Sequence, residues 1–206
     1  MKKNSNNLGK SWLESVRYII DNGHIIEDVI ETNGLLIAIS GDFIDGHAYE
    51  KYFDKNMTDW MVNNNFGSDQ PIKEWGYSYG IRLYNFDGTN QIEEIFKKLH
   101  SNPGTKSATI SLMNPTFDFS RHMPCVNVID FKLRDNKLNL YCFFRSQDIG
   151  KKMCADVKAL SEIQKQLAIR LSCEIGMITS FIASAHVYLD DVSNLKNVLK
   201  KEKLLK

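Results

Sequence analysis

Apolar residues recur at helical spacing in three parts of the chain. In residues 11–21 they stand at positions 12, 13, 16, 19 and 20, and an Asn-Gly pair follows. Residues 90–100 and 153–173 show the same periodicity, so each of these segments is predicted to form an amphipathic helix. The segment 153–173 is predicted to be the longest helix, and residues 48–53 are predicted to form a short one.

Shorter apolar or alternating runs predict the strands. Such runs cover residues 34–40, 106–113, 125–133, 138–144 and 178–188, and residues 134–137 are typical of a hairpin turn. Helices packed on a mainly antiparallel or mixed sheet make an α+β fold. No internal repeat or linker divides the chain, so residues 1–206 are expected to form a single domain. The lysine-rich segment 196–206 is expected to be a solvated helix end or a frayed tail.

The composition excludes several classes of protein. With 26 Lys and Arg against 25 Asp and Glu, the formal net charge is +1, and no basic stripe marks a nucleic-acid interface. No run reaches the roughly 18 consecutive apolar residues of a membrane span, and no apolar stretch follows the positive start as in a signal peptide. A cytoplasmic protein is therefore expected. A few local cations would still suffice to bind a small anionic ligand.

Four cysteines lie scattered along the chain, at positions 125, 142, 154 and 173. They form no CxxC pair, so neither a zinc site nor a disulfide framework is expected, and no metal is predicted. Free thiols fit a reducing compartment. Each cysteine is then either a small core residue or a nucleophile.

Polar groups stand at three points where strands are predicted to begin or end. Cys125 follows Pro124 at the start of a strand, and the Arg-Ser-Gln-Asp sequence at 145–148 is expected to end an aromatic strand. An arginine, a hydroxyl and a carboxylate there could hold a phosphate and orient a base, or could form a surface salt bridge and turn. His186 and Tyr188 are two residues apart, so on a strand they face the same side, as part of a site or only as a polar patch.

The order and spacing of these groups resemble the thymidylate synthase family. In that family a Pro-Cys nucleophile precedes an Arg-Ser-x-Asp motif, and a His-x-Tyr pair follows. Here Arg145 lies 20 residues after Cys125 (145 − 125), and His186 lies 41 residues after Arg145 (186 − 145). The resemblance covers residues 75–190 well and the N-terminal third loosely. Further matching segments are Tyr79-Gly80, the helix and turn at 90–107, and Met113-Asn114-Pro115.

The resemblance implies a fold and a set of roles. The fold is a thymidylate-synthase-like sheet with packed helices, which dimerises through the sheet. Cys125 corresponds to the thiolate that adds to C6 of a pyrimidine nucleotide. Arg145 and Ser146 correspond to ligands of its 5′-phosphate, and His186 and Tyr188 correspond to contacts of its sugar hydroxyls.

The resemblance also implies roles for residues outside the nucleotide contacts. Asp148 corresponds to the carboxylate that orients the folate pterin, and Tyr79 to a tyrosine near the proton-transfer site. In the family, the partner subunit lends two arginines to the phosphate. This chain has Thr105-Lys106 at that place, so a homodimer would supply only the partner subunit's Lys106.

The N-terminal third offers less specific candidates. Glu50 is the candidate for the family's catalytic glutamate, with an exposed helix glutamate as the alternative. Trp60 and Trp75 are candidates for a wall on which the folate stacks, and the alternative is that both are core residues.

These residues suit one-carbon transfer. C5 of a pyrimidine is a poor nucleophile, and addition of a thiolate across C5–C6 makes it enamine-like. A neighbouring cation favours the thiolate, and Arg145 is the natural candidate. The activated C5 then attacks the methylene carbon of 5,10-methylenetetrahydrofolate. The co-substrate supplies the carbon, and the protein supplies orientation and proton transfers.

One departure from the family concerns the base. Eleven residues after Arg145 (156 − 145 = 11), where thymidylate synthases carry the asparagine that reads uracil, this chain has Asp156. An ionised carboxylate cannot donate a hydrogen bond to O4 of uracil, whereas it accepts one from the N4 amino group of cytosine. Family members with aspartate here are the cytidylate hydroxymethylases. The alternative is that Asp156 only caps the helix that begins near residue 153.

The sequence therefore predicts a CMP or dCMP 5-hydroxymethylase that uses methylenetetrahydrofolate and water, with CMP placed slightly ahead of dCMP. Only 18 residues follow Tyr188 (206 − 188), and a short lid would leave the reaction intermediate open to water. The product could feed antibiotic biosynthesis, a modified DNA or a thiamin-like antimetabolite. Two alternatives stay open: a short thymidylate synthase that methylates dUMP, and a catalytically inactive homologue that binds nucleotides.

Overall fold

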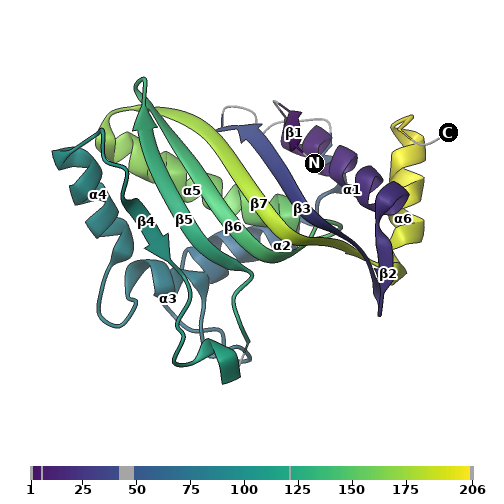
Figure 1. Ribbon diagram of the computed structural model, residues 1–206, viewed down its shortest axis with the longest axis horizontal. Helices are drawn as coiled ribbons and strands as arrows, with labels where there is room; N and C mark the ends of the chain where they lie inside the picture. Colours follow the sequence, from purple (N-terminus) through teal and green to yellow (C-terminus); the bar gives the residue numbers. More distant parts are fainter. Residues whose placement is uncertain (1, 6, 42–48, 121, 205–206) are drawn as a thin grey trace.

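The computed structural model describes residues 2–5, 7–41, 49–120 and 122–204 (Figure 1). Within them, seven strands form one mixed sheet in the order β1-β3-β7-β6-β5-β4, with β2 paired to β3. The strands are β1 (Lys2–Ser5), β2 (His24–Ile26), β3 (Val29–Ser40), β4 (Ala108–Ser111), β5 (Val126–Arg134), β6 (Lys137–Asp148) and β7 (Glu174–Tyr188).

Helices pack mainly on one face of this sheet. The helices are α1 (Leu8–Asn22), α2 (Lys55–Trp60), α3 (Tyr79–Tyr84), α4 (Gln91–Ser101), α5 (Met153–Leu171) and α6 (Leu189–Lys201). A π-helical segment, η3 (Met61–Phe66), continues α2, and two short 3-10 helices are η2 (Glu50–Tyr52) and η4 (Asp118–Ser120). In Figure 1, α5 lies behind the strands β5 to β7, and α1 lies beside α6. No helix of the described residues is long and apolar enough to cross a membrane.

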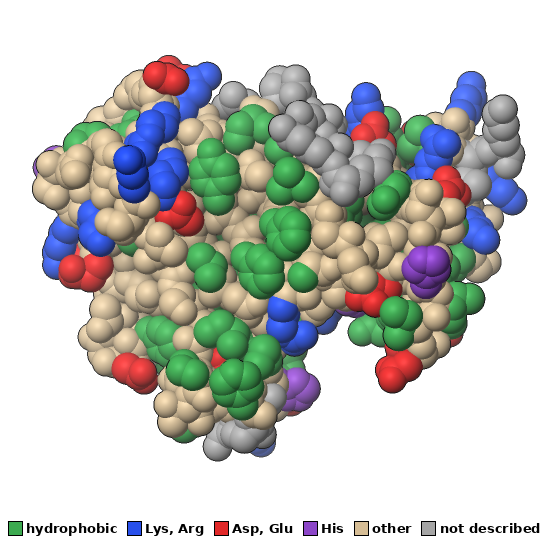
Figure 2. Space-filling view, in the orientation of Figure 1, with side chains coloured by type: hydrophobic (Ala, Val, Ile, Leu, Met, Phe, Trp, Pro, Cys, Tyr) green, Lys and Arg blue, Asp and Glu red, His purple; other side chains and the backbone are tan. Residues whose placement is uncertain are grey.

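The alternation along β6 explains why one face of the sheet is covered and the other is open. Leu140 and Phe144 point into the core and are fully buried, as are Leu160 on α5 and Ile182 on β7. The residues between them point the other way, and Tyr141 and Phe143 stay exposed. Figure 2 shows apolar side chains gathered over the middle of this open face.

Pairing between strands explains where the structure extends the predicted ones. β3 starts at Val29 instead of residue 34, because its first residues pair with the end of β7, with Val29 opposite Tyr188. β6 extends beyond the apolar run predicted at residues 138–144 and continues to Asp148, which pairs with His186. The Arg-Ser-Gln-Asp motif forms the end of this strand, as expected, and β7 supplies pairing partners for its last three residues.

Side-chain caps and residues with positive φ determine where the helices end and where the hairpin turns. α1 begins at Leu8 and not at residue 11, because the Asn7 side chain caps it by accepting a 2.9 Å hydrogen bond from the Lys10 N–H. The predicted hairpin turn is confirmed: Asp135 and Asn136 both have positive φ, which a two-residue turn requires. α5 ends at Leu171, two residues before the predicted end at residue 173, because Ser172 adopts a left-handed conformation at φ 54°.

The remaining predictions are confirmed in part. The helix 90–100 and the strands at 106–113, 125–133 and 178–188 are present with shifted ends. The lysine-rich segment is the end of α6, and residues 205–206 lie outside the described residues, as does residue 48 of the short helix predicted at 48–53. The sequence did not predict β1, β2, α2 or α3.

Candidate active site

Cys125 lies directly before β5 and is half-buried. Its backbone N–H donates a 3.0 Å hydrogen bond to the Tyr79 hydroxyl, which also accepts a 3.2 Å bond from the Val126 N–H. The Sγ atom lies 3.6 Å from Ser146 Oγ and 3.9 Å from Arg145 Nη2. The structure therefore brings together the thiol, the cation and the hydroxyl that the motifs suggested.

The Arg145 side chain holds the turn that carries the thiol. Its Nε donates to the Pro124 carbonyl at 3.0 Å, and its Nη2 donates to the Met123 carbonyl at 2.8 Å. Its Nη1 donates to Ser146 Oγ at 3.2 Å. A charged, planar donor array thus fixes the position of Cys125 and places a positive charge beside its sulfur.

Tyr79 is buried at the start of α3. Its ring packs on Phe66 with a centroid distance of 4.5 Å, and its N–H donates a 3.2 Å hydrogen bond to the Asn65 side chain. Burial raises the pKa of Tyr79 well above its ordinary value, and charges on Cys125 and Asp156 would raise it further. The phenol therefore keeps its proton at neutral pH, directly against the backbone of Cys125.

Asp156 lies in the first turn of α5, and its side chain points to the sheet. Its Oδ2 accepts a 3.0 Å hydrogen bond from Gln147 Nε2 on β6, and both residues are buried. Burial raises the pKa of Asp156 to about 7, against a lowering effect of the Gln147 hydrogen bond. The residue preceding α5, Lys152, makes no side-chain cap, and Asp156 bonds a side chain of the sheet. The capping alternative is therefore wrong.

A polar row continues from Cys125 across the sheet. Asp148 on β6 stands opposite His186 on β7, and Ser146 stands opposite Ser184. The His186 and Tyr188 rings meet edge-on with centroids 5.5 Å apart, which confirms that they share a side of the strand. Burial raises the pKa of Asp148, although its Oδ1 accepts a 3.0 Å hydrogen bond from the Lys151 N–H.

A pocket of about 230 Å³ opens where the chain leaves Asp148. Its aromatic lining consists of Trp12, Tyr52 and Phe53, and Gly150 and Cys154 also line it. Trp12 Nε1 donates a 2.8 Å hydrogen bond to the Ile149 carbonyl, and its ring meets Phe53 edge-on at 5.7 Å. From the sequence, Trp12 was predicted only to be an apolar position of a helix. No local signal distinguishes it from an ordinary core tryptophan.

Three other predicted site residues, Glu50, Trp60 and Lys106, take no part in the contacts described above. Glu50 belongs to η2, just before the aromatic lining, and its carboxylate accepts a 2.6 Å hydrogen bond from Lys158 on α5. Trp60 packs edge-on against Trp75 with centroids 5.8 Å apart. Lys106 is exposed in the loop between α4 and β4.

The sequence reasoning missed a buried ion pair next to the site. Arg82 on α3 forms two hydrogen bonds with the Asp118 carboxylate, at 2.7 and 2.6 Å, and it also donates to the Leu112 carbonyl. Burial opposes ionisation of Asp118, but the Arg82 guanidinium and the Asn114 N–H together outweigh it and lower the pKa of that carboxyl. The pair ties the helix that carries Tyr79 to the loop that leads to Cys125.

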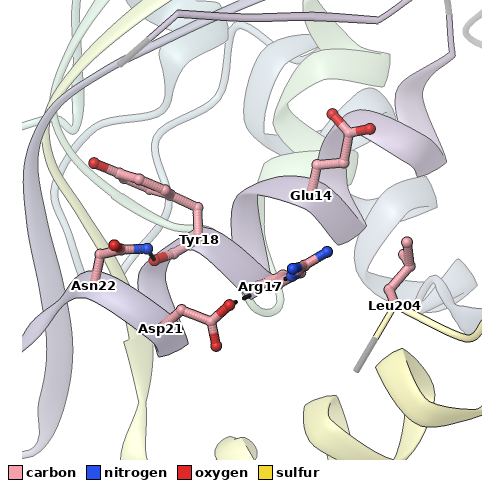
Figure 3. A pocket seen from close by; sticks show the side chains of 6 residues that line it. All are labelled: Glu14, Arg17, Tyr18, Asp21, Asn22 and Leu204. Carbon is pink, nitrogen blue, oxygen red and sulfur yellow. Dashed lines mark hydrogen bonds and ion pairs between the residues drawn. The ribbon is translucent and has the colours of Figure 1, made fainter. Parts of the chain in front are cut away.

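A separate cavity of about 340 Å³ lies against α1, away from these residues (Figure 3). Polar side chains line it together with Leu204, and several satisfy each other: Arg17 and Asp21 form an ion pair at 3.4 Å, and Asn22 donates to the Tyr18 carbonyl. None of the residues around Cys125 lines it. Within the described residues, no cluster of His, Cys, Asp and Glu is suited to hold a metal ion.

A half-buried thiol beside a guanidinium is typical of enzymes that use covalent catalysis by cysteine. Residues 41–205 match the family model for thymidylate synthase. The chain therefore belongs to the thymidylate synthase family, and it is a one-carbon transferase that acts on a pyrimidine nucleotide.

Curated relatives agree with this assignment. A Methanosarcina mazei protein named "Putative thymidylate synthase" is 29% identical over 201 residues, which cover 94% of this chain and 92% of the relative. A Methanopyrus kandleri protein of the same name is 26% identical over 196 residues, which cover 89% of this chain and 91% of the relative. The deoxyuridylate hydroxymethyltransferase of Bacillus phage SP01 is 29% identical over 156 residues, which cover 68% of this chain and 38% of the phage protein.

Proposed function

We propose that this protein is a cytidylate 5-hydroxymethylase. It moves one carbon from 5,10-methylenetetrahydrofolate to C5 of CMP or dCMP, with CMP slightly preferred, and water completes the hydroxymethyl group. The observation that carries the proposal is the buried carboxyl of Asp156, bonded to Gln147 at 3.0 Å, at the place in the chain where the family reads the base.

The choice of base follows from hydrogen-bond chemistry. An asparagine amide donates to O4 of uracil and accepts from its N3–H, whereas an ionised carboxylate only accepts. Cytosine has an amino donor at C4, which a carboxylate of Asp156 satisfies. Uracil would place its O4 against the carboxylate and leave both groups unpaired in a buried site, which is costly.

The residues around Cys125 support covalent catalysis. The Cys125 thiolate adds to C6 of the pyrimidine, and the electron pair moves to C5, which becomes the nucleophile. The Arg145 guanidinium, 3.9 Å from the sulfur, stabilises the thiolate. The Tyr79 phenol keeps its proton and is placed to assist the proton transfers, and Glu50 remains the proposed carboxylate for handling water.

The polar row across the sheet supports nucleotide binding. We assign Arg145 and Ser146 to the 5′-phosphate, and His186 and Tyr188 to the sugar hydroxyls. The first pair lies on β6 and the second pair on β7. These strands are adjacent and parallel, so one nucleotide can span both pairs. The partner subunit's Lys106 would complete the phosphate site in a dimer.

The aromatic pocket beside Asp148 supports a folate site. A pterin is a flat ring with polar edges, and Trp12, Tyr52 and Phe53 provide apolar faces, with the Asp148 carboxyl at the end of β6 just before Gly150. When bound, methylenetetrahydrofolate supplies the carbon that is transferred. Trp60 lies outside the lining of this pocket, and its contact with the folate remains a prediction.

The open face of the sheet supports a homodimer. Tyr141, Phe143 and Phe181 are 43%, 37% and 42% exposed, and the two phenylalanine rings stack with centroids 5.7 Å apart. A second copy of this chain would cover this apolar face, as the family resemblance implies. We further propose that residues 1–206 form one domain and that the protein acts in the cytoplasm, where its free thiols stay reduced.

A mass-spectrometric assay tests the proposal. The protein is incubated with methylenetetrahydrofolate and, separately, CMP, dCMP, UMP and dUMP. Hydroxymethylation of a cytidylate adds about 30 Da to it, whereas methylation adds about 14 Da. Product from a cytidylate supports the proposal, and the Cys125→Ser variant must form none.

A second candidate is hydroxymethylation of dUMP, because the phage relative is named for that substrate. The same assay separates the two, since product from dUMP alone contradicts the cytidylate proposal. A gain of about 14 Da on dUMP alone would indicate a short thymidylate synthase. An absence of any product with all four nucleotides would favour an inactive homologue.

A further inference from the structure

Gln147 lies inside the active site without a role in the mechanism described above. It sits between Ser146 and Asp148 on β6, and its side chain is 3% exposed. Its Nε2 donates a 3.0 Å hydrogen bond to Oδ2 of Asp156, which is 6% exposed. A buried amide that touches the residue proposed to read the base is placed to control how that residue reads it.

The direction of this hydrogen bond determines which oxygen of Asp156 can carry a proton. An amide nitrogen only donates, so Oδ2 must offer a lone pair to it. Because the carbonyl oxygen of a protonated carboxyl is the stronger acceptor, the contact with Gln147 favours placing a proton of Asp156 on Oδ1. Among the described residues, Oδ1 has no hydrogen-bond partner, so it is free to meet a ligand.

We propose that Gln147 is a positioning residue that divides the two oxygens of Asp156 between two tasks. It holds Oδ2 as a permanent acceptor, and it leaves Oδ1 as the atom that reads the group at C4 of the base. This inference rests on the proposed function, in which Asp156 contacts the base. When ionised, Oδ1 accepts from the 4-amino group of a cytidylate; when protonated, it donates to the 4-oxo group of a uridylate.

The surroundings of Asp156 place the change between its protonated and ionised forms near neutral pH. Burial raises the pKa of Asp156 to about 7. Lys152, at the start of α5, lowers it, and Asp148 on β6 raises it. Three further titratable groups feel the charge of Asp156: Tyr79 on α3, Cys142 on β6 and Cys154 on α5. All three have pKa values raised by burial, so they stay neutral while Asp156 titrates.

The consequence is a base preference that changes with pH. Above the pKa of Asp156 the site favours cytidylates, and below it the affinity for uridylates rises. Without the Gln147 amide, the ionised carboxylate loses a hydrogen bond, so Asp156 should become harder to ionise. The midpoint of the change in base preference should then move to higher pH.

Measuring nucleotide affinity over a range of pH tests the proposed role of Gln147. Dissociation constants for dCMP and dUMP are determined by calorimetry between about pH 5.5 and about pH 8.5, on either side of the expected midpoint. The unaltered protein is compared with Gln147→Met, which keeps the shape of the side chain and removes the amide. Gln164→Met is the matched control, because Gln164 is also a buried glutamine whose amide donates, but to the Leu138 carbonyl.

In Gln147→Met the midpoint should rise by about one pH unit, and the dCMP preference at neutral pH should fall by about tenfold. Gln164→Met should leave the midpoint unchanged. An unchanged midpoint in Gln147→Met, or an equal shift in both variants, would overturn the inference while leaving the proposed function intact.

The proposed function fails separately, if the mass assay shows no cytidylate product. In that case the dUMP affinity alone still tests Gln147. Its dependence on pH should shift upward in Gln147→Met and not in Gln164→Met, and an unshifted dUMP profile would overturn the inference.

Discussion

Replacing Asp156 by asparagine should remove a pH-dependent cost to stability. Burial raises the pKa of Asp156 from 3.8 to about 7, a change of roughly three units. At 1.36 kcal/mol per unit, ionising the buried carboxyl costs about 4 kcal/mol more in the folded than in the unfolded chain. Asparagine carries no charge, and its side-chain oxygen still accepts from Gln147.

The sign follows from which state holds the proton. Below pH 3.8 the carboxyl is protonated in both states, so its full contribution to stability is present. As pH rises toward 7, only the folded chain keeps the proton, so stability falls, and above pH 7 the loss is complete. The free energy of unfolding of Asp156→Asn, relative to the unaltered protein, should therefore rise by about 4 kcal/mol between about pH 4 and about pH 8.

Urea unfolding followed by circular dichroism at several pH values measures this difference. The control is Asp59→Asn on the exposed side of α2, which makes the same chemical change outside the core. Because Asp59 is exposed, the stability difference between Asp59→Asn and the unaltered protein should change far less with pH than that of Asp156→Asn. A difference for Asp156→Asn that changes by less than about 1 kcal/mol would refute the assignment of Asp156 as a buried carboxyl that is neutral below pH 7.

Three further predictions address the rest of the molecule. Iodoacetamide should modify Cys125 well before Cys142, because Cys142 is buried and burial raises its pKa to about 12. Peptide mass mapping after brief labelling gives the order, and faster labelling of Cys142 would contradict the prediction. Arg82→Met should lower the free energy of unfolding by about 3–5 kcal/mol in urea titrations, because it leaves Asp118 as an unpaired buried charge, and a loss below about 1 kcal/mol would contradict this. Phe143→Asp, on the open sheet face, should convert a dimer to a monomer in analytical ultracentrifugation with an unchanged circular dichroism spectrum; a monomer before the substitution would refute the proposed interface.

Most of the secondary structure could be predicted from periodicity, because helices and strands repeat their buried positions locally. The stripes of α1, α4 and α5 and the alternation of β5 and β6 are visible in the chain itself. The short elements α2, α3 and β2 gave no such signal. Six residues or fewer hold too few turns or alternations to separate a pattern from chance, and packing on neighbours determines their conformation.

The sequence by itself determined the family and the set of reactive groups, because motif order and spacing are properties of the chain. Cys125, Arg145 and His186 could be recognised together from their intervals of 20 and 41 residues. The family resemblance also aligned Asp156 with the position that it implies for reading the base, but it left open whether that carboxyl serves the substrate or caps a helix.

Only the tertiary structure decided which groups those residues contact. The contact of Gln147 with Asp156, the Arg82–Asp118 ion pair and the place of Trp12 in the aromatic pocket all join segments distant in the chain. Such contacts depend on how α1, α3 and α5 pack on the sheet, and residue spacing does not encode that geometry locally. Burial in that packed core also moves the pKa of Asp156 to about 7, where one carboxyl can present either an acceptor or a donor to a base.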